Sequence, residues 1–244
     1  MQTPAQVGYN FHTYALSEQA VTMEFGQMIS DETLEQINNF NNLLHQRPFP
    51  GFHTTVPAYA TLTVFYDPLL VMISNAMVGL SCFEKVSRYL NSINSIPHNI
   101  PVLTYETVTI PVCYGGAFGP DLEELAALHN LTPQEVINLH AAPVYKVYMI
   151  GFVPGFAYLG GMDFRLETPR RLAPRNDIPA GAVGIAGKQT GVYPLKTPGG
   201  WQIIGRTPLQ LFNAERPQPS LLKAGDNVIF KAIDRQEFDY LANN

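Results

Sequence analysis

Three arginines gather in one short segment of the sequence that two prolines stiffen. Arg170 and Arg171 follow Pro169, and Arg175 follows Pro174. A guanidinium group presents a planar fork of donors that suits a carboxylate or a phosphate, so the segment predicts an anion-binding loop. A run of charges is equally often a solvated surface loop or a patch of salt bridges between protomers, and the residues alone leave both interpretations open.

Two later segments, residues 189–194 and 197–201, each combine glycine and proline with one aromatic residue. Glycine lets a ligand approach the backbone, while Tyr193 and Trp201 offer flat walls, so the segments could frame a ligand-binding groove. Barrel corners filled with packed aromatic residues are the simpler explanation. The same two interpretations apply to the aromatic residues of segment 152–158.

His140 is a candidate for proton transfer outside these segments. Histidine titrates near neutral pH and is the usual proton shuttle of enzymes. The position of His140 at the end of a short predicted helix also fits a residue that stabilises the helix C-terminus. Cys113, inside a predicted strand, is expected to be a small buried hydrophobic residue rather than a nucleophile.

The motifs of several enzyme classes are absent from the sequence. It contains no Gly-x-Gly-x-x-Gly, Gly-x-Ser-x-Gly or Cys-x-x-Cys, and no serine between Ile100 and Pro219. Segment 181–189 approaches a phosphate loop, but Ala182 replaces its first glycine and Gln189 replaces its hydroxyl residue. The histidines do not follow a metal-ligand spacing, so no metal site is predicted.

The first half of the chain is predicted to be α+β. The expected elements are a strand over 20–25, a helix capped by Ser30 or Asp31 with Leu34, Ile37, Asn41 and Leu44 on one face, strands over 51–56 and 59–66, and a long helix over 68–90. This order suggests a ferredoxin-like α/β sandwich. Segment 104–113 is expected to open the next domain rather than to complete this sheet.

The second half is predicted to be mostly β, because glycine and proline punctuate short apolar runs. Eleven glycines lie between Gly151 and Gly205. The pattern is typical of a closed or nearly closed β-barrel, preceded by short helices that begin at Asp121 and at the capping box of Thr132 and Glu135. We therefore predict two domains, residues 1–101 and 102–244.

Composition limits the class of protein. The 244 residues are 46% hydrophobic and 14% charged, with a net charge of -5, which excludes a disordered chain and argues against a nucleic-acid partner. The apolar stretch 68–80 is too short to span a bilayer, and residues 1–14 do not resemble a signal peptide. Two cysteines suggest a reducing compartment. We expect a cytoplasmic protein without a membrane partner.

A series of motifs in the second half resembles one known family. The matching segments are Ile110–Gly116, Gly119–Leu122, Glu135–His140, Gly151–Leu159, Thr168–Arg171, Pro174–Arg175, Ile178–Gly181, Gln189–Pro194, Pro198–Gln202 and Gly205–Thr207. The family comprises the B subunits of the bacterial ATP-hydrolysing 5-oxoprolinases, with the Kip-type histidine-kinase inhibitors and the allophanate hydrolase subunit 1-like carboxyltransferase domains. The first half matches more loosely, and segment 71–101 matches no motif of the family.

The resemblance implies a cyclophilin-like C-terminal barrel and a multi-subunit enzyme. Such a chain would be inactive alone and would work with the A and C subunits of 5-oxoprolinase to convert 5-oxo-L-proline to L-glutamate. The complex would use ATP with Mg²⁺, the chain would hold no cofactor by itself, and the site would be shared with the homologous C subunit. The alternative that the family offers is a regulatory protein that inhibits a sensor histidine kinase.

Residue chemistry and the family motifs together give the candidate site. The expected substrate-binding residues are Arg170, Arg171, Arg175, Trp201 and Arg206. Tyr158, Gln189 and Tyr193 would orient the substrate or an intermediate by hydrogen bonds, and His140 would transfer a proton.

Overall fold

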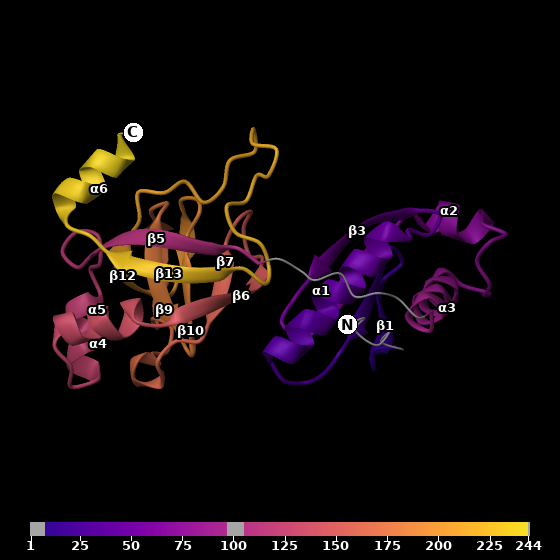
Figure 1. Cartoon of the computed structure of the whole chain (residues 1–244), viewed down its shortest axis with the longest axis horizontal. Coiled ribbons are helices and arrows are strands. Elements are labelled where there is room, and N and C mark those ends of the chain that lie inside the picture. Colours follow the sequence, from indigo (N-terminus) through magenta and orange to yellow (C-terminus); the bar gives the residue numbers. More distant parts are fainter. Residues whose placement is uncertain (1–7, 97–104, 244) are drawn as a thin grey trace, which may run out of the picture. The chain divides into compact units, whose positions relative to one another are not determined.

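The computed structural model describes residues 8–96 and 105–243, which fall into two compact units, Met1–Thr104 and Tyr105–Asn244 (Figure 1). The predicted boundary between residues 101 and 102 lies outside the described residues. Each unit has its own hydrophobic core.

The first unit is an antiparallel sheet with helices packed against it. Its strands are β1 (His12–Ser17), β2 (Ala20–Glu24), β3 (Phe52–Pro57) and β4 (Thr61–Tyr66), in the order β1-β2-β4-β3. Alternate residues of β4 face the core, where Leu62, Val64 and Tyr66 are buried. The helices α1 (Asp31–Gln46) and α3 (Cys82–Asn94) contribute their apolar faces to this same core.

Helix α1 begins where the sequence predicts. Ser30 is its N-cap, and the Ser30 hydroxyl accepts a hydrogen bond from the backbone N–H of Thr33. The expected apolar face is confirmed, because Leu34, Ile37 and Leu44 are buried. Asn41 of that face is only half-buried, and its side chain accepts a hydrogen bond of 2.6 Å from the Thr55 hydroxyl of β3.

The prediction of one long helix over 68–90 is wrong. The segment forms α2 (Pro68–Ile73) and then, after a loop, α3. Gly79 in this loop has a φ of +154°, and a Cβ there would lie 2.8 Å from the backbone N of Lys85. Ser81 caps α3, and the buried Lys85 ammonium donates to the carbonyls of residues 71, 72 and 74 at the end of α2. These polar contacts favour two helices over one.

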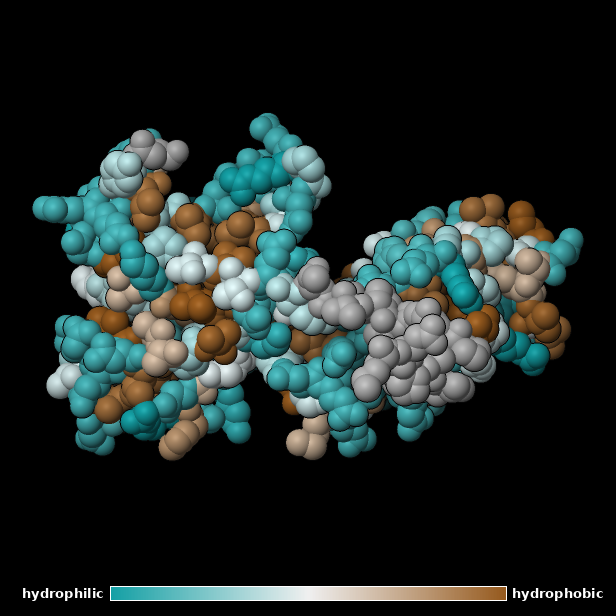
Figure 2. Space-filling model, viewed as in Figure 1, coloured by the Kyte–Doolittle hydropathy of each residue, from teal (hydrophilic) through white to brown (hydrophobic). Residues whose placement is uncertain are grey.

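The loop after α2 leaves an apolar surface uncovered within the first unit. Leu69, Ile73 and Leu80 are 75%, 72% and 92% exposed, and no charged residue lies between Asp67 and Glu84. In Figure 2, hydrophobic atoms gather where Figure 1 places α2. Surfaces of this kind are typical of interaction sites.

A ferredoxin-like first domain is not confirmed. In the observed sheet the edge position beside β2 belongs to β1, which precedes β2 in the chain. The strand that follows α3, β5 (Thr107–Tyr114), pairs with β12 and β13 of the second unit instead. This agrees with the prediction that segment 104–113 opens the next domain.

The second unit is a closed barrel, as predicted. Its strands follow the order β10-β7-β6-β13-β5-β12-β9, where β6 is Val144–Ile150, β7 Ala157–Gly160, β9 Ala182–Ala186, β10 Gln189–Val192, β12 Gln202–Arg206 and β13 Asn227–Ala232. Only the pair of β5 and β13 is parallel among the pairings described for this barrel. Closure removes the exposed edges of the sheet.

Short elements surround the barrel. They are α4 (Leu122–Leu128), α5 (Pro133–Ala141), the 3-10 turn η1 (Phe164–Leu166), α6 (Arg235–Ala242) and a small sheet of β8 (Arg175–Ile178) and β11 (Thr197–Gly199). The capping box of Thr132 and Glu135 is confirmed. No helix in the described part of the chain is long and apolar enough to span a membrane.

Candidate functional site

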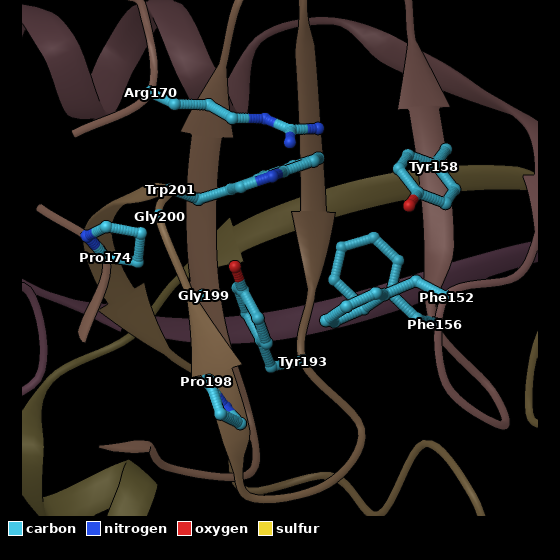
Figure 3. A pocket seen from close by; sticks show the side chains of 10 residues that line it. All are labelled: Phe152, Phe156, Tyr158, Arg170, Pro174, Tyr193, Pro198, Gly199, Gly200 and Trp201. Atoms are coloured by element: carbon cyan, nitrogen blue, oxygen red, sulfur yellow. The ribbon is translucent and has the colours of Figure 1, made fainter. Parts of the chain in front are cut away.

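A pocket of about 270 Å³ opens on the second unit and is walled mainly by aromatic rings (Figure 3). Its lining residues are Phe152, Phe156, Tyr158, Arg170, Pro174, Tyr193, Pro198, Gly199, Gly200 and Trp201. They come from the loop before β7, from β7 itself, from the arginine segment, from the end of β10, and from β11 with the two residues that follow it. The two sequence patterns that suggested a groove and an anion-binding loop therefore meet in one pocket.

Edge-to-face packing fixes the floor of this pocket. The Phe156 ring lies 4.8 Å from Tyr158, 5.2 Å from Tyr193 and 5.4 Å from Trp201 between ring centroids. Glycine keeps one side of the pocket open, since a Cβ on Gly199 would lie 2.5 Å from the Tyr193 hydroxyl. Any side chain at position 199 would displace this ring.

Asp121 organises the arginine segment. The Arg175 guanidinium donates two hydrogen bonds to the Asp121 carboxylate, at 2.8 and 2.6 Å, and Arg171 donates a third at 2.7 Å. The backbone N–H of Ile203 donates a fourth, at 2.6 Å. The Asp121 side chain is only 3% exposed, so this is a buried carboxylate whose charge is fully compensated.

The Asp121 contacts leave Arg170 as the cation of the pocket. Arg171 and Arg175 are committed to Asp121, whereas Arg170 has no salt bridge or hydrogen bond from its side chain within residues 8–96 and 105–243. The backbone N–H of Arg171 donates to the Gly200 carbonyl at 2.7 Å and so joins the arginine segment to the chain just before Trp201. In Figure 3 the Arg170 guanidinium lies beside the Trp201 indole, at the side of the pocket away from the phenylalanines.

Two phenol groups complete the polar part of the pocket. Burial raises the pKa of Tyr158, an effect that nearby Arg170 partly opposes. Burial also raises the pKa of Tyr193 to about 12. Both hydroxyls therefore stay protonated at neutral pH and can donate hydrogen bonds to an acceptor held by Arg170.

Comparison with known proteins identifies the family of this chain. The family model for the carboxyltransferase domain, subdomain C and D, matches residues 11–222. The chain belongs to this family.

Two proteins similar to this chain are named as subunits of an enzyme. The chain is 46% identical to the B subunit of 5-oxoprolinase from Bacillus subtilis, over 91% of this chain and 93% of that protein. It is 38% identical to the protein of the same name from Escherichia coli O157:H7, over 89% and 94% of the two chains.

A solved structure of a conserved uncharacterized protein from Pyrococcus horikoshii is 42% identical to the chain. It matches with a TM-score of 0.54, over 93% of this chain and all of that one.

The structure brings four of the predicted site residues together in the pocket and places the others elsewhere in the second unit. The four that line the pocket are Arg170, Tyr158, Tyr193 and Trp201. Arg171 and Arg175 do not line it and bind Asp121 instead. Arg206, Gln189 and His140 are not among the lining residues. The Arg206 Nε donates to the Ala180 carbonyl, and its guanidinium lies 5.8 Å from the centre of the Phe118 ring. Gln189 begins β10, opposite Ala186 of β9.

His140 is fully buried inside the barrel. The Thr190 hydroxyl donates to the Gly184 carbonyl, so it accepts from His140 Nε2 at 2.8 Å. His140 Nδ1 then accepts from the Tyr114 hydroxyl, also at 2.8 Å. Burial lowers the pKa of His140 to about 3, which favours a neutral imidazole that positions core strands.

Acid is expected to destabilise the barrel through His140. Between about pH 6.5 and the folded-state pKa of about 3, the unfolded chain binds a proton at His140 that the folded chain does not. The free energy of unfolding should therefore fall with decreasing pH, by up to about 1.4 kcal/mol per pH unit from this group. Urea denaturation of wild type and His140→Gln between pH 7 and pH 4 measures it. The stability advantage of wild type should shrink towards pH 4, and an advantage independent of pH would contradict the assignment.

Asp121 has a role that its place in the sequence did not predict. The pattern around it indicates the start of a helix, and Asp121 does precede α4, but its side chain makes no capping hydrogen bond. The signal that could have found its role is the excess of arginines over carboxylates in segment 165–177, which requires a partner from elsewhere in the chain.

In the part of the chain that the structure describes, no group of three or more His, Cys, Asp or Glu residues is placed to hold a metal ion.

Proposed function

We propose that this chain is a subunit of a 5-oxoprolinase complex and that its pocket binds the carboxylate of 5-oxo-L-proline through Arg170. The observation that carries the proposal is one guanidinium that forms no ion pair with the described residues, inside an aromatic pocket. A small ring with a single carboxylate fits this pocket. The guanidinium can pair with the carboxylate, and the aromatic walls can cover the ring. The identity to the B subunit of Bacillus subtilis 5-oxoprolinase over most of both chains supports the choice of substrate.

The tyrosines would orient the lactam. Tyr158 and Tyr193 lie in the same pocket as Arg170, and their protonated hydroxyls can donate to the ring carbonyl. Donation to this oxygen makes the carbonyl carbon more electrophilic. The overall reaction is 5-oxo-L-proline + ATP + 2 H₂O → L-glutamate + ADP + phosphate, in which the lactam C–N bond is cleaved.

The remaining steps would belong to the partner proteins. The sequence has no phosphate loop for ATP with Mg²⁺. The A subunit would supply the ATP site, and the homologous C subunit would share the pocket with this chain. The complex would work in the cytoplasm. His140 is enclosed in the barrel, so it would support activity only by holding the barrel strands in position. Gln189 and Arg206 would contribute to the contact with the C subunit or to the stability of the fold.

Reconstitution tests the proposal. Release of L-glutamate from 5-oxo-L-proline with ATP is measured with the A and C subunits, with this chain added or omitted. We expect turnover only with all three chains. Equal turnover without this chain would contradict the proposal, and inhibition of a sensor histidine kinase by the chain would then be measured, since that is the alternative function within the family.

A further inference from the structure

Phe152 lies at the rim of the pocket in a backbone conformation that aromatic residues avoid. Its φ is +70°, and the backbone N–H of Val153 donates to the Gly151 carbonyl at 2.9 Å, which closes a three-residue γ-turn around Phe152. Among the described residues other than glycine, only Asn130 also has a positive φ, and asparagine tolerates it well. A bulky residue there is strained.

The surrounding loop holds the turn in place. The Gly151 N–H donates to the Phe156 carbonyl, and the Phe156 N–H donates to the Val153 carbonyl, both at 3.0 Å. Gly155 has a φ of +80°, and a Cβ there would lie 2.8 Å from the Cβ of Phe212. The loop is therefore anchored at both ends, and Phe152 cannot relax without breaking these contacts.

Packing does not account for the ring of Phe152. The residue is 57% exposed, although its ring lies 5.5 Å from Phe156 in an edge-to-face arrangement. A positive φ at phenylalanine costs stability, and a ring that is 57% exposed gains little from burial, so neither explains why phenylalanine occupies the position. The remaining role is contact with something that enters the pocket, which Phe152 lines.

We infer that Phe152 is a ligand-contacting residue that covers one face of a small, planar ring carboxylate held by Arg170. Arg170 and Trp201 lie at one side of the pocket and Phe152 lies at the other (Figure 3). A ligand whose acid faces Arg170 thus presents its ring to the phenylalanine. The inference rests on the proposed function where it takes 5-oxo-L-proline as the ligand, but it extends to any ring carboxylate of this size.

The test uses Trp201, the only tryptophan of the chain and a residue of the pocket wall, as a fluorescent reporter. The full chain is titrated with 5-oxo-L-proline and with benzoate, a planar ring carboxylate that is not a lactam. Phe152→Gly removes the ring and the strain together, whereas Phe152→Tyr keeps both. Phe164→Gly is the matched control, because Phe164 is 76% exposed, does not line the pocket and has no positive φ.

Phe152→Gly is expected to weaken ligand binding by about fivefold and to raise the urea midpoint. Phe152→Tyr should bind like wild type, and Phe164→Gly should lower the midpoint without changing affinity. Unchanged affinity in Phe152→Gly, a midpoint that falls as in Phe164→Gly, or no saturable response of wild type to either ligand would overturn the inference. A response to benzoate but not to 5-oxo-L-proline would keep the inference and refute the substrate of the proposed function.

Discussion

Replacing Arg170 with alanine is expected to raise the KM of the reconstituted complex for 5-oxo-L-proline by about 10- to 100-fold. Hydrogen bonds to a charged partner contribute about 1.5–3 kcal/mol, and no second cation of the pocket can replace the one that is lost. Arg171 and Arg175 are held by Asp121, so they cannot move to the ligand without leaving a buried carboxylate unpaired. The measurement is steady-state release of L-glutamate over a range of substrate concentrations.

The stability of the Arg170→Ala chain should remain close to that of wild type, because Arg170 makes no salt bridge in the described part of the chain. Arg165→Ala is the matched control, since Arg165 is exposed, pairs with Asp163 and does not line the pocket. Its kinetics should equal those of wild type. A KM of Arg170→Ala within about twofold of wild type would show that the guanidinium does not contact the substrate.

Asp121→Asn is expected to destabilise the second unit by about 3 kcal/mol. The amide keeps the shape of the side chain but removes the negative charge that compensates Arg171 and Arg175. Removing one partner of a buried ion pair is costly because the other charge is left unpaired. The amide NH₂ group would also face the N–H of Ile203 or a guanidinium, neither of which accepts hydrogen bonds. Urea denaturation followed by Trp201 fluorescence measures this loss.

Asp163→Asn serves as the control for Asp121→Asn. Asp163 also binds an arginine, Arg165, but that arginine is half exposed and the pair is at the surface. Exposed pairs contribute little, so the control should stay within about 1 kcal/mol of wild type. Equal effects of the two substitutions would contradict the assignment of Asp121 as the buried anchor of the arginine segment.

Local signals predict the parts of the fold that depend on neighbouring residues. Ser30 and Thr132 cap helices as expected, because a hydroxyl within reach of the N3 backbone N–H is decided by adjacent sequence. The broken helix after Pro68 was missed, since the ammonium that ends α2 comes from Lys85, in the next helix. Strand β1 was also missed, because its sequence, HTYALS, lacks a clear alternation and is mostly exposed.

Long-range pairing decides the roles in the site. Residue chemistry identifies the arginine segment, yet Arg170, Arg171 and Arg175 look alike in sequence. Asp121, which is 54 positions from Arg175 in the chain, binds Arg171 and Arg175 and so gives these two arginines a structural role. The strain at Phe152 is equally invisible in sequence, because a positive φ at phenylalanine contradicts its ordinary preference.

The central claim is that Arg170 recognises the carboxylate of the substrate. The most direct test removes the guanidinium from the protein and the charge from the substrate, first separately and then together. Turnover or competitive inhibition is compared for 5-oxo-L-proline and its uncharged carboxamide, in complexes that contain wild-type chain or Arg170→Ala. We expect the wild-type complex to prefer the acid by at least about tenfold and the variant to treat both compounds nearly alike. If the variant retained the full preference for the acid, another group would bind the carboxylate, and Arg170 would not be the residue that recognises it.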